Sequence, residues 1–447
     1  MTTAVTDMQS VYQDEYKRKL MTAQDAVKPL QSRTNIAFGM GAGQPPALLE
    51  AIAQRLRTAS LEQLKIYYKI AMEHAAKTVL APDVLHAIEA HPLFMTEVDR
   101  AIIKKQMETG KKVLSFVPSY FYQIPRLLTE FISIDSFVIT VSPMDQFGYF
   151  SLGTNNDYAS TVLRNCRYVA VEVNKNMPRV FGESLVHVSE IHAIVENNVP
   201  LLESATHPVQ PEDEKIGQLV AEMIPDGATI QMGIGGIPNA VAKYLGDRKD
   251  LGIHTELLCD GMMQLIKQGV VNGKKKSIHR HKHVFTVALG TKELYDFMDD
   301  NPSMESYPSS YCNDPAVISK NDNMISINSA IEIDLYGQVN AENINHHEFS
   351  GTGGALDFMR GAFDAKGGKS ILALYSTARH GEFSRIVPWL VNNVTDPRMD
   401  TAYVVTEYGV ANLKGKSTKE RALALIELAH PKFREELISK AKEVTLI

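Results

Sequence analysis

The stretch Thr229–Met263 combines a glycine-rich turn with an acidic side chain, two features that can do chemistry together. The apolar run Ala228–Met232 predicts a buried strand, which leads into the glycine turn Gly233–Gly236. Pro238 predicts the start of a helix, because proline favours a first helical turn. Free backbone N–H groups at such a turn can bind an anion or a developing oxyanion, although glycine also serves tight turns that bind nothing.

Two glutamates follow strand-like runs and are candidates for a nucleophile. A short strand predicted over Gly252–Thr255 places Glu256 at its carboxyl end, and ligands bind outside the carboxyl ends of the strands in open parallel sheets. Glu407, in VVTEYGVANLKGKS, has a similar position. We take Glu256, beside the glycine turn, as the nucleophile. His254 is either a neighbouring acid–base group or a core histidine.

A second glycine cluster lies in FSGTGGALDFMRGA, residues 349–362, and contains Gly351, Gly353 and Gly354. One interpretation is a tight connection within a packed domain. The other is a backbone cradle for the carbonyl or pyrophosphate of a ligand. The cluster alone leaves both open.

Other motifs carry weaker signals. GIGGIPN lacks the third glycine of a dinucleotide-binding turn, and no Gly-Lys-Ser/Thr follows it. HRHKHVF, residues 279–285, follows Lys274–Lys276 and is predicted as a solvated edge rather than a metal or nucleic-acid site, although its charge could assist a phosphorylated ligand. The adjacent histidines of NHHEF point to opposite sides of an extended chain and make a poor metal site. Cys259 is predicted as a small core residue.

Composition excludes several classes of protein. The 447 residues predict two or three domains, and 44% hydrophobic with 22% charged residues predicts a large core. A net charge of −6 gives no general attraction to nucleic acid or anionic membranes. No apolar run reaches the roughly 18–20 residues that cross a bilayer, and the N-terminal segment lacks the apolar core of a signal peptide. Three widely spaced cysteines suit a reducing compartment, so we expect a cytoplasmic protein.

Strand-like and helical runs alternate along the N-terminal half. Strands are predicted at 32–38, 65–70, 113–117, 137–141 and 168–173, and helices over 1–30, 97–110 and 123–132. Such alternation predicts an α/β fold with a mainly parallel sheet.

The glycine turn has a counterpart earlier in the chain. Setting Gly41 on Gly233 gives an offset of 192 residues (233 − 41) and carries Pro46 onto Pro238. After the earlier turn, Lys69 takes roughly the place of the candidate glutamate. Only the second copy therefore carries the acid.

A second internal match follows at nearly the same spacing. VSPMDQFGYFS resembles SAIEIDLYGQVN and sets Asp145 on Asp334, an offset of 189 residues (334 − 145). We predict two similar open α/β domains, an internal duplication, over residues 1–205 and 206–447. The polar segment 203–214 is the predicted linker between them.

Several long motifs resemble the acetyl-CoA hydrolase/transferase family: GIGGIPNAV, GIHTELLCDGM, NSAIEIDLYGQVN, GTGGALDFMRGA, STARHGEFSRIVP and VVTEYGVANLKGKS. FVPSYFYQIP, VSPMDQFGYFSLG and VNKNMPRVFG extend the likeness into the N-terminal half, so that it covers nearly the whole chain. Within the family, the sequence is most similar to the 4-hydroxybutyrate and butyryl-CoA:acetate CoA-transferases.

The resemblance implies two α/β domains of the CoA-transferase type, with the active site at their junction, in a homodimer or larger homo-oligomer. It implies Glu256 as the nucleophile, oriented by Asn313, and Glu407 as a structural acid. The glycine turn would contact coenzyme A and supply oxyanion donors. The residues that the resemblance assigns to coenzyme A binding are Ile234, Gly235, Gly236, Ile237, Pro238, Ile331, Gly353 and Gly354.

We therefore expect an enzyme that moves CoA between a short-chain acyl-CoA and acetate, by ping-pong chemistry through a glutamyl-CoA thioester. We expect no metal and no tightly bound cofactor; acyl-CoA and a short carboxylate are its partners, whereas nucleic acid and membranes are not. Three alternatives stay open: an acetyl-CoA hydrolase that uses the same glutamate, an NAD-dependent oxidoreductase, and a non-catalytic acyl-CoA-binding protein. Candidates for the walls of the acyl pocket are Lys69, Tyr120, Gln123 and Met144.

Overall fold

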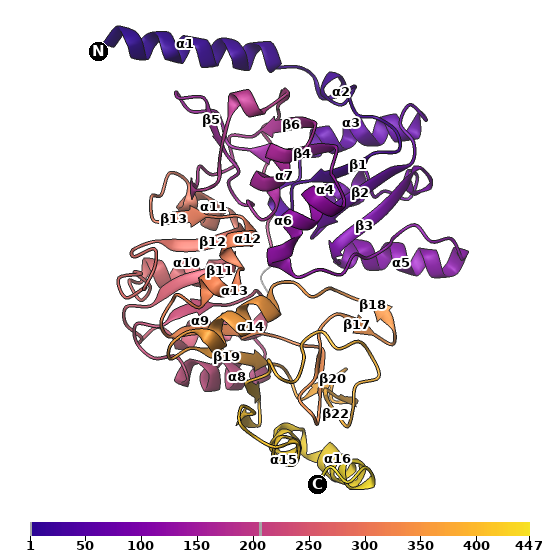
Figure 1. Ribbon diagram of the computed structural model, residues 1–447, viewed down its shortest axis with the longest axis vertical. Coiled ribbons are helices and arrows are strands. Elements are labelled where there is room, and N and C mark those ends of the chain that lie inside the picture. Colours follow the sequence, from indigo (N-terminus) through magenta and orange to yellow (C-terminus); the bar gives the residue numbers. More distant parts are fainter. Residues whose placement is uncertain (1, 205–207) are drawn as a thin grey trace. The chain divides into compact units, whose positions relative to one another are not determined.

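The computed structural model of the chain describes residues 2–204 and 208–447 (Figure 1). It has two compact units: unit 1 comprises Met1–Ser204 and Thr286–Tyr311, and unit 2 comprises Ala205–Phe285 and Cys312–Ile447. This division differs from the predicted domains, 1–205 and 206–447, in the segment 286–311, which belongs to unit 1. The predicted linker lies partly outside the described residues, and its last residues begin helix α8 (Pro211–Glu222).

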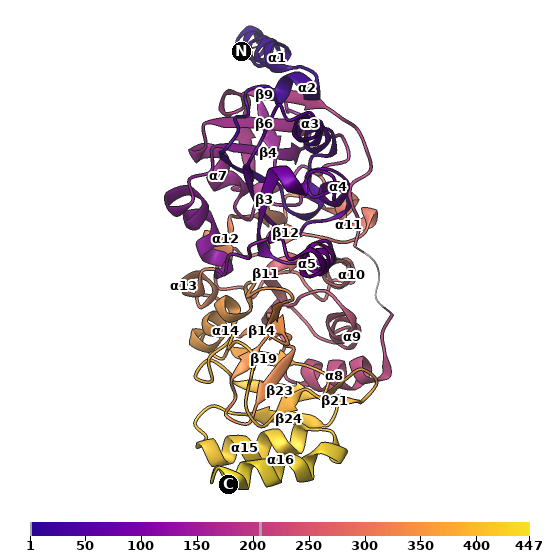
Figure 2. The same ribbon diagram turned by 90° about the vertical axis from the view of Figure 1, so that its right-hand side faces the viewer.

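Unit 1 is built on a six-stranded parallel sheet in the order β3-β2-β1-β4-β6-β9. Its strands are β1 (Asn35–Phe38), β2 (Leu64–Lys69), β3 (Ile88–Phe94), β4 (Ser136–Val141), β6 (Tyr168–Val173) and β9 (Ala193–Glu196). Every residue of β4 and β6 is buried, because helices cover both faces of a parallel sheet. Helices α3 (Pro46–Arg57) and α4 (Glu73–Lys77) lie on one face, and α7 (Ala159–Asn165) lies on the other (Figure 2).

Unit 2 is built on six neighbouring strands of a nine-stranded sheet, in the order β24-β23-β19-β14-β10-β11. The strands are β10 (Thr229–Gln231), β11 (Gly252–Leu258), β14 (Met324–Asn328), β19 (Lys369–Ala373), β23 (Tyr403–Thr406) and β24 (Gly409–Asn412), of which only β24 runs antiparallel to its neighbour. One face carries α8, α9 (Gly236–Tyr244) and α10 (Asp260–Lys267), and the other carries α13 (Pro315–Ile318) and α14 (Ala355–Asp364) (Figure 2). The chain ends with α15 (Thr418–Leu428) and α16 (Pro431–Glu443).

The two sheets share one topology, which confirms the predicted duplication. Strands β2-β1-β4-β6-β9 of unit 1 and β11-β10-β14-β19-β23 of unit 2 follow the chain in the same order and are parallel throughout. In both copies, a glycine turn and a helix connect the first strand to its neighbour.

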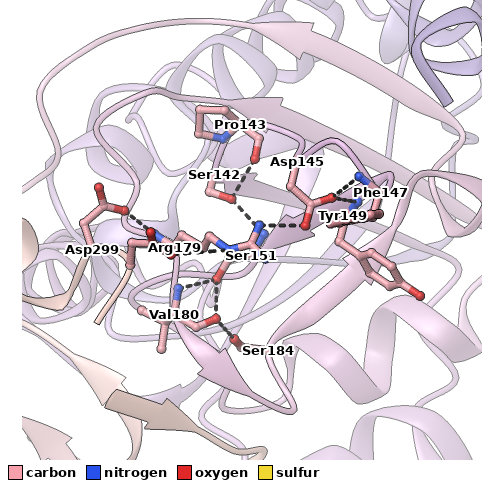
Figure 3. A network of polar contacts seen from close by, with 11 residues as sticks. Ser142, Pro143, Asp145, Phe147, Tyr149, Ser151, Arg179, Val180, Ser184 and Asp299 are labelled. Atoms are coloured by element: carbon pink, nitrogen blue, oxygen red, sulfur yellow. Dashed lines mark hydrogen bonds and ion pairs between the residues drawn. The ribbon is translucent and has the colours of Figure 1, made fainter. Parts of the chain in front are cut away.

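The second internal match, at Asp145 and Asp334, is a repeated hairpin turn. Each aspartate accepts hydrogen bonds from the backbone N–H groups two and four residues later, at 2.8 and 2.9 Å for Asp145 and 3.0 and 2.9 Å for Asp334. A glycine with positive φ follows three residues after each aspartate: Gly148 at 85° and Gly337 at 90°. Other residues rarely adopt this conformation. In the first copy, Arg179 also donates to Asp145 at 2.7 Å (Figure 3).

Some predicted elements differ from the observed ones. The helix predicted over 1–30 is α1 (Thr2–Lys19) followed by α2 (Ala23–Ala26), and the helix predicted over 97–110 is α5 (Glu97–Thr109). The helix predicted over 123–132 is α6 (Ile124–Arg126) followed by a π-helix, Leu127–Phe131. The strand predicted over 113–117 is wrong, because that segment makes only an isolated bridge. The prediction missed β3, whose exposed residues and proline do not read as a buried strand.

All three cysteines of the chain are free, and Cys259 and Cys312 are buried. None of the helices within residues 2–204 and 208–447 is long and apolar enough to cross a membrane.

Candidate active site

Glu256 lies within strand β11 rather than after it. The strand runs to Leu258, so the prediction that it ends at Thr255 is wrong. In the ladder, Ile230 of β10 pairs with Ile253, and β10 ends one residue later, so β11 continues beyond its neighbour. The side chains of β11 are buried up to Thr255, and Glu256 is the first partly exposed one. The carboxylate therefore stands at the carboxyl edge of the sheet.

Asn313 and Gly354 meet the carboxylate of Glu256. The amide nitrogen Nδ2 of Asn313, which is fully buried, donates to Oε2 of Glu256 at 2.8 Å. A Cβ atom added to Gly354 would lie 1.8 Å from Glu256 Oε2 and 2.2 Å from Asn313 Nδ2. Only glycine leaves both side chains in these positions, because real Cβ atoms do not approach so closely. The structure thus brings together three residues that the sequence singled out separately.

His254, two residues before Glu256 on β11, is a core histidine. Its Nε2 lies 2.8 Å from the carbonyl oxygen of Cys312, and its Nδ1 lies 3.4 Å from the amide nitrogen of Asn321. Burial lowers the pKa of His254 to about 3, with a further contribution from the charge of Lys276. The imidazole is therefore neutral at physiological pH and is not an acid–base group.

Cys312 was not predicted as part of the site. Its thiol Sγ donates to the carbonyl oxygen of Thr255 at 3.1 Å, and its own carbonyl oxygen faces His254. Burial, followed by the nearby charge of Glu256, raises the pKa of the Cys312 thiol well above its usual value. The residue is thus an inert thiol that fixes the backbone next to Asn313. Cys259 is buried as predicted.

The glycine turn lies at the same edge of the sheet as Glu256, since Thr255 Oγ1 donates to the carbonyl oxygen of Met232 at 3.3 Å. Helix α9 begins at Gly236, so the prediction that Pro238 opens it is wrong by two residues. Proline is accepted throughout the first turn because those N–H groups have no intrahelical acceptor. Gly235 has a φ of 122°, which glycine tolerates best.

The first turn of α9 rests on Asp213, a residue that the sequence did not indicate. A Cβ atom added to Gly236 would lie 2.2 Å from Oδ2 of Asp213. This buried carboxylate accepts hydrogen bonds from the hydroxyl of Tyr375 at 2.6 Å and from the backbone N–H of Gln210 at 2.8 Å. Asp213 and Tyr375 therefore form a support beneath the glycine turn.

The remaining predicted binding residues differ in exposure. Of the glycine-turn residues, Ile234 is 43% exposed and Ile237 is buried. Gly353, beside Gly354, has a φ of 57°. Ile331 is half-buried and its N–H donates to the carbonyl oxygen of Asn340 at 2.9 Å.

Glu407 fits the structural role that the resemblance implies. Its carboxylate accepts hydrogen bonds from the backbone N–H and the hydroxyl of Ser376, at 2.9 and 2.5 Å. These bonds join the segments that follow β19 and β23. Glu407 is therefore engaged in holding two loops together.

The basic segment is solvated only in part. Arg280 and His281 are exposed, as predicted for an edge. The prediction is wrong for His283–Phe285, which are buried in strand β12 (His283–Ala288). Lys276, in the lysine run before this segment, is also buried and donates to the carbonyl oxygens of Ile253 at 2.7 Å and Lys282 at 2.9 Å. Buried carbonyl acceptors replace the water that a lysine ammonium group normally has. Among the described residues, no group of three or more histidines, cysteines and carboxylates could hold a metal ion.

The candidates for the acyl pocket all lie in unit 1. Lys69 is buried, with Nζ 2.8 Å from the centre of the Phe121 ring, and Tyr120 and Gln123 flank that phenylalanine in the chain. Met144 lines a separate cavity of about 350 Å³. Three of the four candidates therefore gather around Phe121, and the fourth does not.

Strand pairing shows which residue of unit 1 corresponds to Glu256. In β1 and β2, Ala37 pairs with Tyr67, and in the second copy Thr229 pairs with Gly252. The offset of 192 residues sets Ala37 on Thr229 (229 − 37), so Lys69 corresponds to His254, two residues before Glu256. The position that matches Glu256 itself is Ala71.

Comparisons with known proteins cover both units. The chain matches the acetyl-CoA hydrolase/transferase N-terminal domain over residues 5–203 and the C-terminal domain over residues 290–441. It is 43% identical to the 4-hydroxybutyrate coenzyme A transferase of Clostridium kluyveri, over 97% of this chain and 99% of that protein. It is 38% identical to the butyryl-CoA:acetate CoA-transferase of Anaerostipes caccae, over 97% and 98% of the two chains. The crystal structure of RipA from Yersinia pestis is 47% identical, with a TM-score of 0.95 over 98% of this chain and 100% of that one. These matches confirm the resemblance seen in the motifs, and the chain is therefore a CoA-transferase of the acetyl-CoA hydrolase/transferase family.

Proposed function

We propose that this CoA-transferase moves CoA between a short-chain acyl-CoA and acetate, with Glu256 as its nucleophile. The observation that carries the proposal is the carboxylate of Glu256, held at the carboxyl edge of the sheet by Asn313 at 2.8 Å and packed against Gly354. Relatives named for 4-hydroxybutyrate, butyryl-CoA and acetate support an acyl group of this size.

The reaction proceeds in two halves. A carboxylate oxygen of Glu256 attacks the thioester carbon, the carbon–sulfur bond breaks, and a glutamyl–acyl anhydride and CoA thiolate form. The thiolate then attacks the glutamyl carbonyl carbon, releasing the acyl group as a free carboxylate and leaving a glutamyl-CoA thioester. Acetate takes the same path in reverse and departs as acetyl-CoA, so the glutamate is regenerated.

Each residue of the site has a role in this scheme. A carboxylate is a weak nucleophile, so its orientation by Asn313 is needed to bring it into line with the thioester. Each tetrahedral intermediate carries an oxyanion, which backbone N–H groups of the glycine turn and of Gly353–Gly354 would stabilise. Ile234, Ile237, Pro238 and Ile331 would contact coenzyme A, which acts here as substrate.

A transfer assay tests the proposed function. The purified protein is mixed with butyryl-CoA or 4-hydroxybutyryl-CoA, with and without acetate, and acetyl-CoA and free CoA are measured over time. We expect acetyl-CoA to appear only with acetate, and much faster than free CoA without it. Free CoA release at an equal rate in both mixtures would identify a hydrolase. Binding of acyl-CoA without either product would identify a binding protein.

A further inference from the structure

We propose that His254 is a positioning residue, which holds Asn313 and the first turn of α14 against the nucleophile. This inference rests on the proposed role of Glu256. His254 is buried, and its two ring nitrogens face Cys312 and Asn321, so it acts through these neighbours rather than on the substrate.

The first link runs through Cys312. His254 Nε2 lies 2.8 Å from the carbonyl oxygen of Cys312, and the Cys312 thiol donates to the carbonyl oxygen of Thr255. Cys312 is therefore bonded to strand β11 at two residues, His254 and Thr255, which directly precede Glu256. Asn313 follows Cys312 directly in the chain, so these bonds set where its amide meets Glu256.

The second link runs through helix α14. The ring of His254 packs edge-on against the buried ring of Phe358, with the ring centres 6.3 Å apart. The N–H of Phe358 donates to the carbonyl oxygen of Gly354 at 3.1 Å, so the two residues are neighbours one turn apart. Two segments that contact Glu256 are thus tied to the same imidazole: the segment of Asn313 through Cys312, and the start of α14 through Phe358.

The protonation of His254 suits this role. The amide nitrogen of Asn321 faces Nδ1 as a donor, which assigns the proton to Nε2, where it can be donated to the carbonyl oxygen of Cys312. The buried ammonium group of Lys276 donates to the carbonyl oxygen of Ile253, next to His254 on β11, and opposes a positive charge on the ring. The imidazole is therefore neutral at physiological pH, with its proton on Nε2.

Three variants test the inference. His254→Phe keeps an aromatic ring against Phe358 but removes the donor to Cys312, whereas His254→Gln can place an amide N–H near the position of Nε2. The matched control is His283→Phe, because His283 is also buried in unit 2, with a pKa lowered to about 4 by burial, and has no described contact with Cys312. Thermal melting of each variant reports the folded fraction.

We expect kcat per folded enzyme to fall about tenfold to a hundredfold in His254→Phe, because misplacement of about 1 Å can cost as much. The KM for acyl-CoA should change little, and His254→Gln should restore most of the rate. His283→Phe should retain the normal kcat. If His254→Phe does not fold, His254→Asn replaces it, since its shorter amide cannot reach the carbonyl oxygen of Cys312.

The outcomes separate this inference from the proposed function. A normal kcat in His254→Phe, an equal loss in His283→Phe, or no recovery in His254→Gln would overturn the positioning role while leaving Glu256 as the nucleophile. Failure of the wild-type enzyme to form a covalent intermediate at Glu256 would instead overturn the proposed function. Both readouts come from the same protein preparations.

Discussion

The proposed nucleophile, Glu256, can react only in a fixed geometry. It projects from a strand, its Oε2 accepts a hydrogen bond from the amide nitrogen of Asn313 at 2.8 Å, and Gly354 packs against the same oxygen. Small changes in reach or packing should therefore affect the rate much more than stability.

Shortening the nucleophile tests its reach. Glu256→Asp keeps the charge but withdraws the carboxylate by about 1 Å, so we expect kcat to fall by about a hundredfold. Glu256→Gln should abolish transfer, because an amide cannot form the anhydride. Steady-state assays with butyryl-CoA and acetate measure both variants. Near-normal turnover by either variant would remove Glu256 from the mechanism.

Gly354 tests the packing around the carboxylate. Gly354→Ala would place a methyl group 1.8 Å from Glu256 Oε2, and the side chain must move to escape it. We expect a loss of at least about tenfold in kcat, in a protein that still folds. The control is Gly246→Ala in the same unit, since its added Cβ atom would come no closer than 3.9 Å to another residue. Equal rates in the two variants would show that the packing at Gly354 is irrelevant.

At the scale of elements, the glycine turn depends on the two helices that lie beside it. Asp213 of α8 supports the first turn of α9 and is itself held by Tyr375, which follows β19. These residues are distant in the chain, so the turn acquires its shape only when the sheet has formed.

Removing the Tyr375 hydroxyl should loosen the turn. Tyr375→Phe leaves one oxygen of the buried Asp213 carboxylate without its donor, which typically costs about 1–3 kcal/mol of stability. We also expect a higher KM for acyl-CoA, because the turn is proposed to bind coenzyme A. Tyr244→Phe is the matched control: its hydroxyl also donates at 2.6 Å to an acid of α8, Glu214, but on an exposed face. The same shift in KM for both variants would count against the proposal that Asp213 and Tyr375 support the glycine turn.

Asp396 gives unit 2 a predictable dependence on pH. It is buried next to β16 (Val339–Asn340), and burial, followed by the charges of Asp400 and Glu342, raises its pKa to about 7. An unfolded aspartate titrates near 3.9, so the folded state binds the extra proton. This contribution to stability is complete below about pH 4 and is lost as the pH rises through 7.

Asp396→Asn should remove that dependence, because asparagine stays neutral. We expect the variant to be more stable than the wild type at pH 8, by about 1–3 kcal/mol, with the advantage shrinking towards pH 4. Urea denaturation at the two pH values measures the difference. If Asp396→Asn is less stable than the wild type by the same amount at pH 8 and at pH 4, the raised pKa of Asp396 is contradicted.

At the scale of the whole molecule, only one of the two copies carries the proposed catalytic carboxylate. Lys69 and alanine 71 stand in unit 1 where His254 and Glu256 stand in unit 2. The N-terminus of α3, which follows the first glycine turn, already has a carboxylate acceptor. Glu172 of β6 accepts hydrogen bonds from the N–H groups of its second and third residues at 2.8 and 3.1 Å. The strand pairings of the two sheets place Ile371 of β19 at the position that corresponds to Glu172 of β6. The second copy therefore has no acid at this position.

This asymmetry predicts one coenzyme A per chain. Calorimetric titration of Glu256→Gln with butyryl-CoA, which it can bind but not transfer, should give a stoichiometry of one. Two sites per chain would show that unit 1 has kept a binding turn of its own.

The sequence predicted those features of the molecule that depend on residues close together in the chain. Alternating runs predicted the α/β fold, two matched turns predicted the duplication, and family motifs pointed to Glu256, Asn313 and Gly354. The contacts behind them were not predictable, because they join residues that are far apart: His254 and Cys312 are separated by 58 positions, and Asp213 and Tyr375 by 162. A buried lysine such as Lys276 was equally hidden, since only the fold supplies its carbonyl partners.

The central claim is that Glu256 carries the CoA group during turnover. The wild-type enzyme is incubated with acetyl-CoA without an acceptor, reduced with borohydride and digested, and the modified peptide is identified by mass spectrometry. We predict reduction of the side chain of Glu256, and of no other residue, as expected for a glutamyl thioester. Modification at Glu407 would move the nucleophile to the other candidate strand end. An unmodified enzyme that nevertheless binds acetyl-CoA would contradict covalent catalysis altogether.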